Sequence, residues 1–345
     1  FVPVRTTCGQ GSSRSATSPG LDYLITWGHR NKSGMSGQVT VMQRSVEIVE
    51  VGPRDGLQSE PGVMPTATKV EFINRLIAAG LKRLEVTSFV HPKKVPQMAD
   101  AEDVLAQIDK RPGVYYVGLV LNRRGFDRAQ AAGCNEIGMA VVASDTFNRR
   151  NQGVGTEESI AAWLEIAAAA HAAGIRPQVT VSAAFGCPFE GEVSVDRVVD
   201  IAKRVAAGKP YEIALADTIG VGVPAQVTEI IGRVRAELPG MRIRCHFHNT
   251  RNTGIANAYA AIAAGVDSLD ASTGGIGGCP FAPAATGNIP TEDLVYMLQR
   301  MGISTGVDLD ALIGIGEWLQ GVLGRPVPSM LVKAGNFPRP AQQAA

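Results

Sequence analysis

The sequence predicts a (β/α)8 TIM barrel with a short extra C-terminal helix, and three observations support this fold class. From residue 46, apolar β-rich runs alternate with segments of helical spacing. Eight such units fit into roughly 255 residues, which matches a barrel in count, order and length. Polar residues also collect where the strands end, as active-site groups do in barrels. A doubly wound open sheet is the alternative, but no Gly-x-Gly-x-x-Gly turn follows the first strand.

The elements follow from hydrophobic periodicity. In the first predicted helix, Ile73, Leu76 and Ile77 recur on one face, and Gly80 follows as a stop. Strands are predicted near 46–52, 83–89, 114–121, 136–143, 176–185, 212–219, 241–248 and 267–272. Helices are predicted near 68–80, 98–108, 123–132, 156–173, 194–207, 223–238, 253–264, 291–301 and 308–324.

Composition divides the chain into three parts. Residues 1–42 are rich in Ser, Gly, Thr and Arg, with Asp22 as the only acid. This composition predicts a disordered or non-native extension, or alternatively an organellar transit peptide. Residues 43–305 are expected to form the catalytic barrel. Residues 306–345 are expected to form the extra helix and a tail packed on the barrel.

Charge and cysteine usage narrow the class of protein. Lys plus Arg is 33 and Asp plus Glu is 32, so a net charge of +1 argues against a nucleic-acid partner. The basic pairs Arg123-Arg124 and Arg149-Arg150 would meet phosphates or form a solvated face. No apolar run approaches membrane-spanning length, so no membrane partner is expected. The five cysteines form no Cys-x-x-Cys pair, which indicates a reducing compartment. We expect a cytoplasmic protein, or a mitochondrial-matrix one if residues 1–40 are a transit peptide.

Four residues have the chemistry of a metal site. His246 and His248 alternate on a predicted strand, so both imidazoles lie on one face, either as metal ligands or as hydrogen-bonded histidines. Asp55 lies in a turn after the first strand, as a turn residue or a carboxylate ligand. Asn288 closes a Gly-rich loop, as a turn residue or a carbonyl ligand. Such an O/N set without thiolate favours six-coordinate Mg²⁺ or Mn²⁺.

Other polar residues near strand ends are candidates for acid–base and electrostatic chemistry. Arg54 would stabilise a transient oxyanion. Glu85 and Asp217 point toward the barrel mouth by strand position, either as functional acids or as ion-pair partners of Arg54. Cys279 lies in a Gly-rich loop and is a candidate for proton transfer. Cys187 lies in a similar Gly-Cys-Pro-Phe segment, so local sequence does not choose between the two cysteines.

Several segments together resemble the 3-hydroxy-3-methylglutaryl-CoA lyase family, within the metal-dependent lyase and Claisen-synthase barrels. The similarity runs from about residue 46 to 310, and the loop with Cys279 is its most specific part. The segments are Gly52-Pro-Arg-Asp-Gly-Leu-Gln58, Glu85-Val-Thr-Ser-Phe-Val90, Asp217-Thr-Ile-Gly-Val-Gly222, His246-Phe-His248, Gly277-Gly-Cys-Pro-Phe281 and Thr291-Glu-Asp-Leu-Val-Tyr-Met297.

The resemblance implies a role for each matching residue. It assigns the divalent cation, Mg²⁺ or Mn²⁺, to Asp55, His246, His248 and Asn288. It implies that Arg54 stabilises the enolate and that Cys279 is the loop cysteine acting at the site. Glu85 and Asp217 would match the family's supporting acids, and Gln58 a substrate-pocket residue.

The implied reaction is a retro-Claisen cleavage of 3-hydroxy-3-methylglutaryl-CoA to acetyl-CoA and acetoacetate. The metal would bind the tertiary hydroxyl and the terminal carboxylate and acidify the hydroxyl. Either His246 or Asp217 would take its proton, and Arg54 would hold the enolate until it is protonated by way of Cys279. The expected partners are an acyl-CoA substrate and further copies of the chain in a homodimer or larger homo-oligomer.

One departure from the family pattern keeps other substrates open. After the second histidine the family usually shows Asp-Thr-Tyr-Gly, whereas this chain reads Asn249-Thr-Arg-Asn-Thr-Gly254. The change alters the charge expected beside the metal, so a related substrate such as citramalyl-CoA is an alternative. A Claisen-condensing acyltransferase of the isopropylmalate synthase type is another, although those enzymes generally have a larger C-terminal region. A barrel that binds acyl-CoA without catalysis would leave four ligand-type residues idle.

Overall fold

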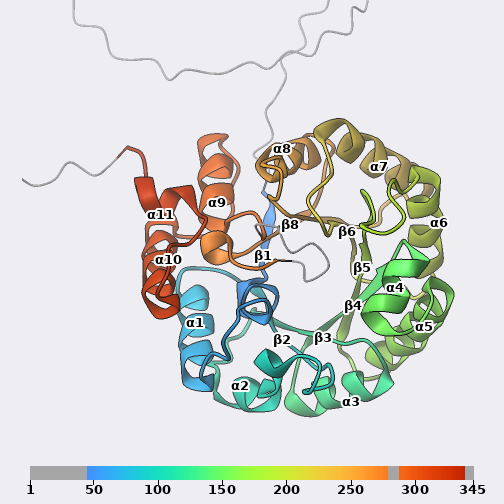
Figure 1. Cartoon of the computed structure of the whole chain (residues 1–345), viewed down its shortest axis with the longest axis horizontal. Helices are drawn as coiled ribbons and strands as arrows, with labels where there is room; N and C mark the ends of the chain where they lie inside the picture. The colour runs from blue at the N-terminus through green and yellow to red at the C-terminus, as the bar shows by residue number, and fades with distance from the viewer. Residues whose placement is uncertain (1–44, 279–286, 339–345) are drawn as a thin grey trace, which may run out of the picture. The chain divides into compact units, whose positions relative to one another are not determined.

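The computed structural model describes residues 45–278 and 287–338, and it is a closed parallel barrel in which each strand pairs with its neighbours in sequence. β1 also pairs with β8, which closes the ring (Figure 1). The (β/α)8 prediction is confirmed, and each predicted strand overlaps an observed one. The strands are β1 Glu47–Glu50, β2 Arg83–Ser88, β3 Tyr115–Leu119, β4 Glu136–Val142, β5 Arg176–Ser182, β6 Ile213–Asp217, β7 Ile243–Phe247 and β8 Ser268–Ala271.

Helices surround the barrel, and each predicted helix overlaps an observed one. The α-helices are α1 Thr66–Ala78, α2 Ala101–Gln107, α3 Arg123–Ala132, α4 Asp145–Gln152, α5 Thr156–Ala172, α6 Val195–Ala206, α7 Pro224–Glu237, α8 Gly254–Ala263, α9 Thr291–Arg300, α10 Leu309–Leu323 and α11 Met330–Ala334. Three short turns of other helix types are η1 Gly52–Gly56, η2 Pro96–Met98 and η3 Thr273–Gly275.

Two helices were not predicted, α4 and α11. Helix α4 buries only Phe147 and Asn148, so its sequence carries almost no apolar periodicity. Its caps were the available signal: the Ser144 hydroxyl accepts a hydrogen bond from the Phe147 N–H at 3.2 Å, and Gly153 ends the helix in the left-handed region. Helix α11 has five residues, none of them buried, which is too short for a periodic pattern.

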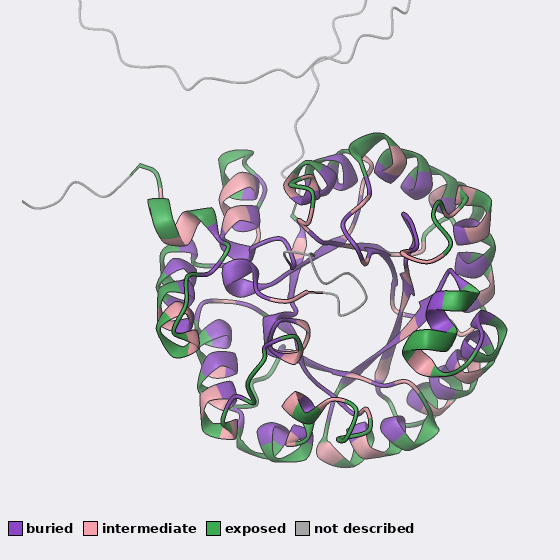
Figure 2. Cartoon of the chain, viewed as in Figure 1, coloured by how far each residue is buried: buried purple, intermediate pink, exposed green. Residues whose placement is uncertain are grey.

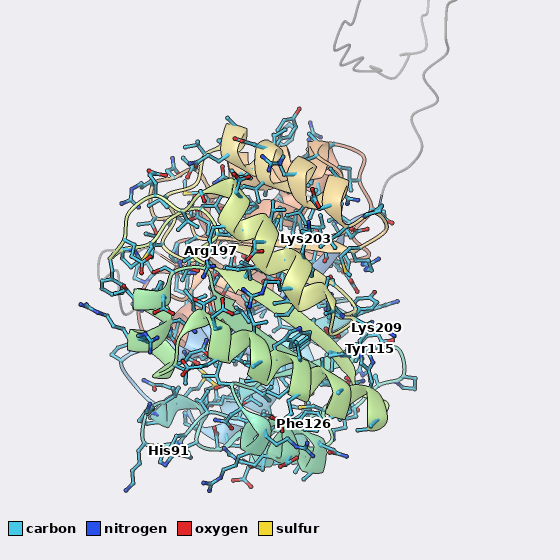
Figure 3. All side chains as sticks on the ribbon, turned by 90° about the vertical axis from the view of Figure 1, so that its right-hand side faces the viewer. His91, Tyr115, Phe126, Arg197, Lys203 and Lys209 are labelled. Atoms are coloured by element: carbon cyan, nitrogen blue, oxygen red, sulfur yellow. The ribbon has the colours of Figure 1, made fainter. Side chains whose placement is uncertain are left out.

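Burial follows the layers of the barrel. The strands are almost entirely buried, whereas the helices bury one face and expose the other (Figure 2). On α6, Lys203 is exposed, whereas Arg197 is half-buried and donates to the carbonyl of Ala143 at 3.2 Å (Figure 3). The Lys203 ammonium contacts Glu237 of α7 at 2.7 Å, so neighbouring helices are also joined by surface charges.

The segment after α9 packs on the barrel wall. Helix α10 lies beside α9 and α1, and α11 lies beside α9 and α10 (Figure 1). The rings of Phe72 in α1 and Trp318 in α10 are 5.9 Å apart. The helix predicted at 308–324 is thereby confirmed as α10. The prediction for residues 1–42 and that for the tail beyond 338 lie outside the described residues. Among the described helices, none has the length and apolarity needed to cross a bilayer.

Candidate metal centre and active site

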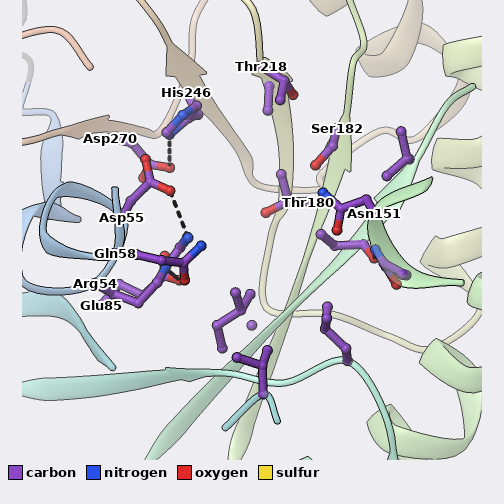
Figure 4. A pocket seen from close by; sticks show the side chains of 18 of the residues that line it. Arg54, Asp55, Gln58, Glu85, Asn151, Thr180, Ser182, Thr218, His246 and Asp270 are labelled. Atoms are coloured by element: carbon purple, nitrogen blue, oxygen red, sulfur yellow. Dashed lines mark hydrogen bonds and ion pairs between the residues drawn. The ribbon is translucent and has the colours of Figure 1, made fainter. Parts of the chain in front are cut away.

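A cavity of about 510 Å³ opens at the end of the barrel where the strands finish. Every strand, or the turn that follows it, contributes to its wall (Figure 4). This position is where barrel enzymes place their active sites. The wall includes Arg54, Asp55, Glu85, Leu119, Ala140, Thr180, Ser182, Ala216, His246, His248 and Asp270.

The turn after β1 is a single turn of π-helix, and it presents Arg54 and Asp55 to the cavity. A Cβ at Gly56 would lie 2.6 Å from the Ile276 side chain, so this close approach requires glycine. The Arg54 guanidinium contacts Glu85 at 2.5 Å through Nε and Asp55 at 2.7 Å through Nη1. The ion pair predicted between Glu85 and Arg54 is therefore present, and it fixes the direction of the guanidinium.

Asp55, His246 and His248 converge on one point. Each offers one ligand atom, and these three atoms all lie within 4.8 Å of one another. Asn288 joins them, because its Nδ2 donates to Asp55 Oδ2 at 2.9 Å and to the carbonyl of Ile276 at 3.1 Å. Its Oδ1 is buried without a hydrogen-bond partner. A cation bound at this oxygen would satisfy it. The donors present fit a divalent cation that prefers oxygen and imidazole nitrogen.

Electrostatics favour the ligand forms of the Asp and one His. Burial opposes ionisation of Asp55, but Arg54 and the two imidazoles outweigh it and lower its pKa to about 2. Burial, together with the neighbouring His246, lowers the pKa of His248 to about 4. At neutral pH the site therefore holds an ionised carboxylate and a neutral imidazole, which are the forms that bind metal.

A buried carboxylate beneath the site ties two distant segments together. Glu50 is fully buried and accepts hydrogen bonds from the Gly52 N–H at 2.8 Å and the Thr273 N–H at 2.9 Å. It also accepts from the hydroxyls of Thr273 at 2.7 Å and Thr291 at 2.8 Å. The contacts hold the turn that bears Asp55 against the segments on both sides of Asn288.

Glu85, Gln58 and Asp217 differ in whether they line the cavity. Glu85 and Gln58 both line the cavity, and Gln58 Oε1 is buried without a partner. Asp217 is not in the cavity wall. Its carboxylate accepts from the N–H groups of Val221 and Gly222, both at 2.9 Å, and burial raises its pKa.

Of the two cysteines considered from the sequence, the structure describes only Cys187. Cys279 lies outside the described residues. Cys187 is buried, its sulfur lies 2.9 Å from the Ser144 hydroxyl, and it does not line the cavity. Cys187 is therefore a buried structural cysteine, and the role predicted for Cys279 stays a prediction.

The residues that depart from the family pattern connect loops. Arg251 donates to the carbonyl oxygens of Ile219 at 3.2 Å and Gly220 at 2.9 Å. Asn249 accepts from the Gly254 N–H at 3.0 Å, at the start of α8. Neither residue lines the cavity, so the charge change expected beside the metal does not extend to the cavity wall.

Sequence reasoning missed Asp270, Thr180 and Ser182, which line the cavity. Asp270 Oδ2 lies 3.1 Å from His246 Nδ1 (Figure 4). The available signal was alternation, because a polar residue at every second position of a strand marks the face opposite its apolar residues. In β8, Ser268 and Asp270 alternate with Leu269 and Ala271 in this way.

The comparisons agree with this geometry. The model of the HMGL-like family matches residues 45–319. The chain is 45% identical to (R)-citramalyl-CoA lyase of Chloroflexus aurantiacus, over 84% of this chain and 95% of that one. It is 44% identical to the mitochondrial hydroxymethylglutaryl-CoA lyase of Mus musculus, over 85% and 90%. A solved HMG-CoA lyase from Acinetobacter baumannii, in complex with coenzyme A and 3-methylmalate, superposes with a TM-score of 0.84 at 40% identity, over 87% and 98%.

The barrel and its relatives together define the class of protein as a carbon–carbon lyase. The chain belongs to the HMGL-like family. The resemblance predicted from the motifs is thus confirmed.

Proposed function

We propose that this protein cleaves 3-hydroxy-3-methylglutaryl-CoA to acetyl-CoA and acetoacetate by a retro-Claisen reaction. The observation that carries the proposal is the convergence of Asp55, His246 and His248 beside a cavity that also contains Arg54. In a member of a lyase family, this arrangement provides a cation site next to a fixed positive charge. Both are needed to cleave a bond that leaves an enolate.

We assign the cation, Mg²⁺ or Mn²⁺, to Asp55, His246, His248 and Asn288. The ligand atoms within 4.8 Å of one another and the unpartnered Asn288 oxygen support this set. When bound, the ion supplies Lewis-acid chemistry that acidifies a substrate hydroxyl. The Asn288 amide would thus bind the cation through Oδ1, while its Nδ2 donates a hydrogen bond that holds Asp55 in place.

Arg54 is proposed to stabilise the enolate oxygen. Burial disfavours its charged form, but Glu85 and Asp55 outweigh this and raise the pKa of the guanidinium above its usual value. The group therefore remains cationic in the cavity. Because the two carboxylates fix its direction before substrate arrives, little reorganisation is required during the reaction.

Proton transfer is assigned to two residues. His246 would use one ring nitrogen for the metal, and the other lies at Asp270, which leaves Asp217 of the two candidate bases. Asp217 does not line the cavity and its carboxylate accepts from two backbone N–H groups, so its role as the base rests on the sequence resemblance. Cys279 is proposed to protonate the enolate, on the grounds of the sequence resemblance.

The substrate is proposed to be an acyl-CoA whose phosphates meet the basic rim of the cavity. Lys94 and Arg150 line the cavity, and within the described residues no carboxylate pairs with either. The Arg150 guanidinium lies 4.1 Å above the ring of Phe189, which holds it at the rim. Of the two basic pairs considered from the sequence, only the second contributes to the cavity wall.

Citramalyl-CoA is the second candidate substrate, because a relative that is 45% identical carries that name. Its cleavage would yield acetyl-CoA and pyruvate. The test is an assay of both thioesters with Mg²⁺ or Mn²⁺, with acetoacetate and pyruvate measured separately. We expect acetoacetate from the first thioester and no product after chelation.

Other outcomes would redirect the proposal. Pyruvate as the main product would make citramalyl-CoA the substrate. Undiminished activity after chelation would exclude the metal mechanism, and condensation of acetyl-CoA with a 2-oxoacid would favour the synthase. A cytoplasmic location and a homo-oligomeric state remain predictions from the sequence.

A further inference from the structure

Arg244 and Asp270 lie beside the proposed metal ligand His246, and the proposed reaction uses neither of them. Inward positions of β7 carry Arg244 and then His246, and β8 carries Asp270 beside them. The register of the two strands places Arg244 opposite Ser268 and Cys245 opposite Leu269. His246 therefore comes next to Asp270, and their Nδ1 and Oδ2 atoms are 3.1 Å apart.

Asp270 is itself held in place by Arg244. Its Oδ1 lies 3.2 Å from Nη1 of Arg244, which is 1% exposed. Arg244 in turn lies 3.2 Å from Glu212 through Nε and donates to the side chain of Gln178. The guanidinium cannot rotate without breaking these contacts. Asp270 Oδ1 lies at the guanidinium and Oδ2 lies at His246, so the carboxylate is placed to accept a hydrogen bond from the Nδ1–H group of His246.

The second histidine offers a contrast within the same site. His248 Nδ1 is buried without a hydrogen-bond partner. Its Nε2 lies 3.9 Å from Asp55 Oδ2. The Nδ1 atom of His246 thus meets a carboxylate, whereas the Nδ1 atom of His248 has no hydrogen-bond partner, although the two rings have centroids only 5.0 Å apart.

We propose that Asp270, backed by Arg244, is a positioning residue that accepts the Nδ1 proton of His246 and leaves the Nε2 lone pair for the metal. The inference rests on the metal site of the proposed function and extends it by one layer of residues. A carboxylate behind a ligating histidine fixes its tautomer and ring direction, and its loss typically weakens metal binding by about 10–100-fold.

The first test uses the wild-type protein without metal. Two-dimensional ¹⁵N–¹H spectra of histidine-labelled protein at about pH 8.5, well above the ordinary imidazole pKa, report which ring nitrogen holds the proton. We expect the Nδ1–H tautomer for His246. An Nε2–H tautomer would overturn the proposal. Because no substitution is made, this result does not depend on the folding of a variant.

The second test is the Asp270→Asn variant, titrated with Mn²⁺ by calorimetry. We expect its affinity for Mn²⁺ to fall about 10–100-fold. The matched control is Asp267→Asn, because this carboxylate near the start of β8 contacts the Ile243 N–H and Arg235 but no proposed ligand. Its Mn²⁺ affinity should equal that of the wild type. Equal affinity in Asp270→Asn would overturn the proposal.

These measurements separate the inference from the proposed function. If Mn²⁺ affinity falls in Asp270→Asn but the wild type cleaves neither thioester, the positioning role stands and the proposed reaction fails. If the wild type cleaves 3-hydroxy-3-methylglutaryl-CoA and Asp270→Asn binds Mn²⁺ unchanged, the reaction stands and the positioning role fails.

Discussion

The two ends of the barrel interior contain similar charged residues but organise them differently. Near the strand starts, four residues form what we term the lower charge cluster: Arg83, Glu136, Arg176 and Glu212. The Arg83 guanidinium is fully buried and contacts Glu212 at 2.6 Å and Glu136 at 2.9 Å. Arg176 lies between the rings of Tyr115 and Tyr211, at 3.5 and 3.8 Å. None of the four lines the cavity at the strand ends.

The cavity end has the opposite character. Arg54 is also paired with two carboxylates, but the same residues line a cavity of about 510 Å³. Buried polar atoms there, such as Asn288 Oδ1 and Gln58 Oε1, have no partner in the protein. In the lower charge cluster Glu212 Oε1 also has no hydrogen-bond partner, but it lies 2.6 Å from the Arg83 guanidinium, which offsets its charge. The comparison teaches that access to a cavity, more than charge, separates a functional cluster from a structural one.

Breaking the lower charge cluster should have the largest effect, and it should act on stability. Arg83→Met leaves Glu136 and Glu212 as buried charges that have lost one partner. We expect the free energy of unfolding in urea to fall by about 3–5 kcal/mol. The control Arg233→Met removes an exposed arginine paired with Asp196 and should change it by less than about 1 kcal/mol. Unchanged stability in Arg83→Met would show that the cluster is not structural.

Substitution of the charged residue Arg54 at the cavity end should reduce turnover. Arg54→Gln removes the proposed enolate stabiliser, so kcat should fall about 10²–10³-fold, equivalent to about 3–4 kcal/mol. Mn²⁺ affinity should remain close to that of the wild type, because Arg54 is not a proposed ligand. Arg128→Gln, which breaks a pair with Glu102 outside the cavity, should keep full turnover. A wild-type rate in Arg54→Gln would remove this residue from the mechanism.

Acid should weaken the lower charge cluster over a defined pH window. Burial alone would raise the pKa of Glu212, but Arg83 and Arg244 outweigh it and lower the value to about 2, from an ordinary 4.5. Because the folded pKa is the lower one, this stabilisation is complete above about pH 4.5 and is lost as pH falls toward 2. The loss would reach about 3 kcal/mol.

Urea unfolding at several pH values measures this effect. The Glu212→Gln variant should show a shallower decline of unfolding free energy below about pH 4.5 than the wild type. Identical declines in the two proteins would indicate that Glu212 does not titrate in this window.

The smallest effect is expected at the rim of the cavity. Arg150→Gln should raise KM for the acyl-CoA by about tenfold, or about 1.4 kcal/mol, without changing kcat. The adjacent Arg149→Gln is a matched control, because Arg149 pairs with Asp145 at 2.8 Å and does not line the cavity. Equal KM values for the two variants would remove Arg150 from substrate binding. Added salt should reduce the difference between them.

The sequence determined the barrel and the chemical types at its mouth. Apolar alternation and helix-stop glycines are local signals, so the order and approximate bounds of β1 to β8 followed from the chain alone. The strand-end positions of Asp55, Glu85 and His246 followed from the same pattern, because parallel strands finish at a common edge. Helix α4 was missed because its stability depends on caps and one buried ring rather than on periodicity.

Tertiary structure alone decided which polar residues act together. Contacts between Asn288 and Asp55, or between Glu50 and Thr273, join residues more than two hundred positions apart, and no local pattern encodes such pairs. The inward face of a strand is readable from alternation, but strand register sets which neighbour it meets, as with Asp270 and His246. The sequence supplied the ligand types, and barrel closure supplied the distances that make a cation site possible.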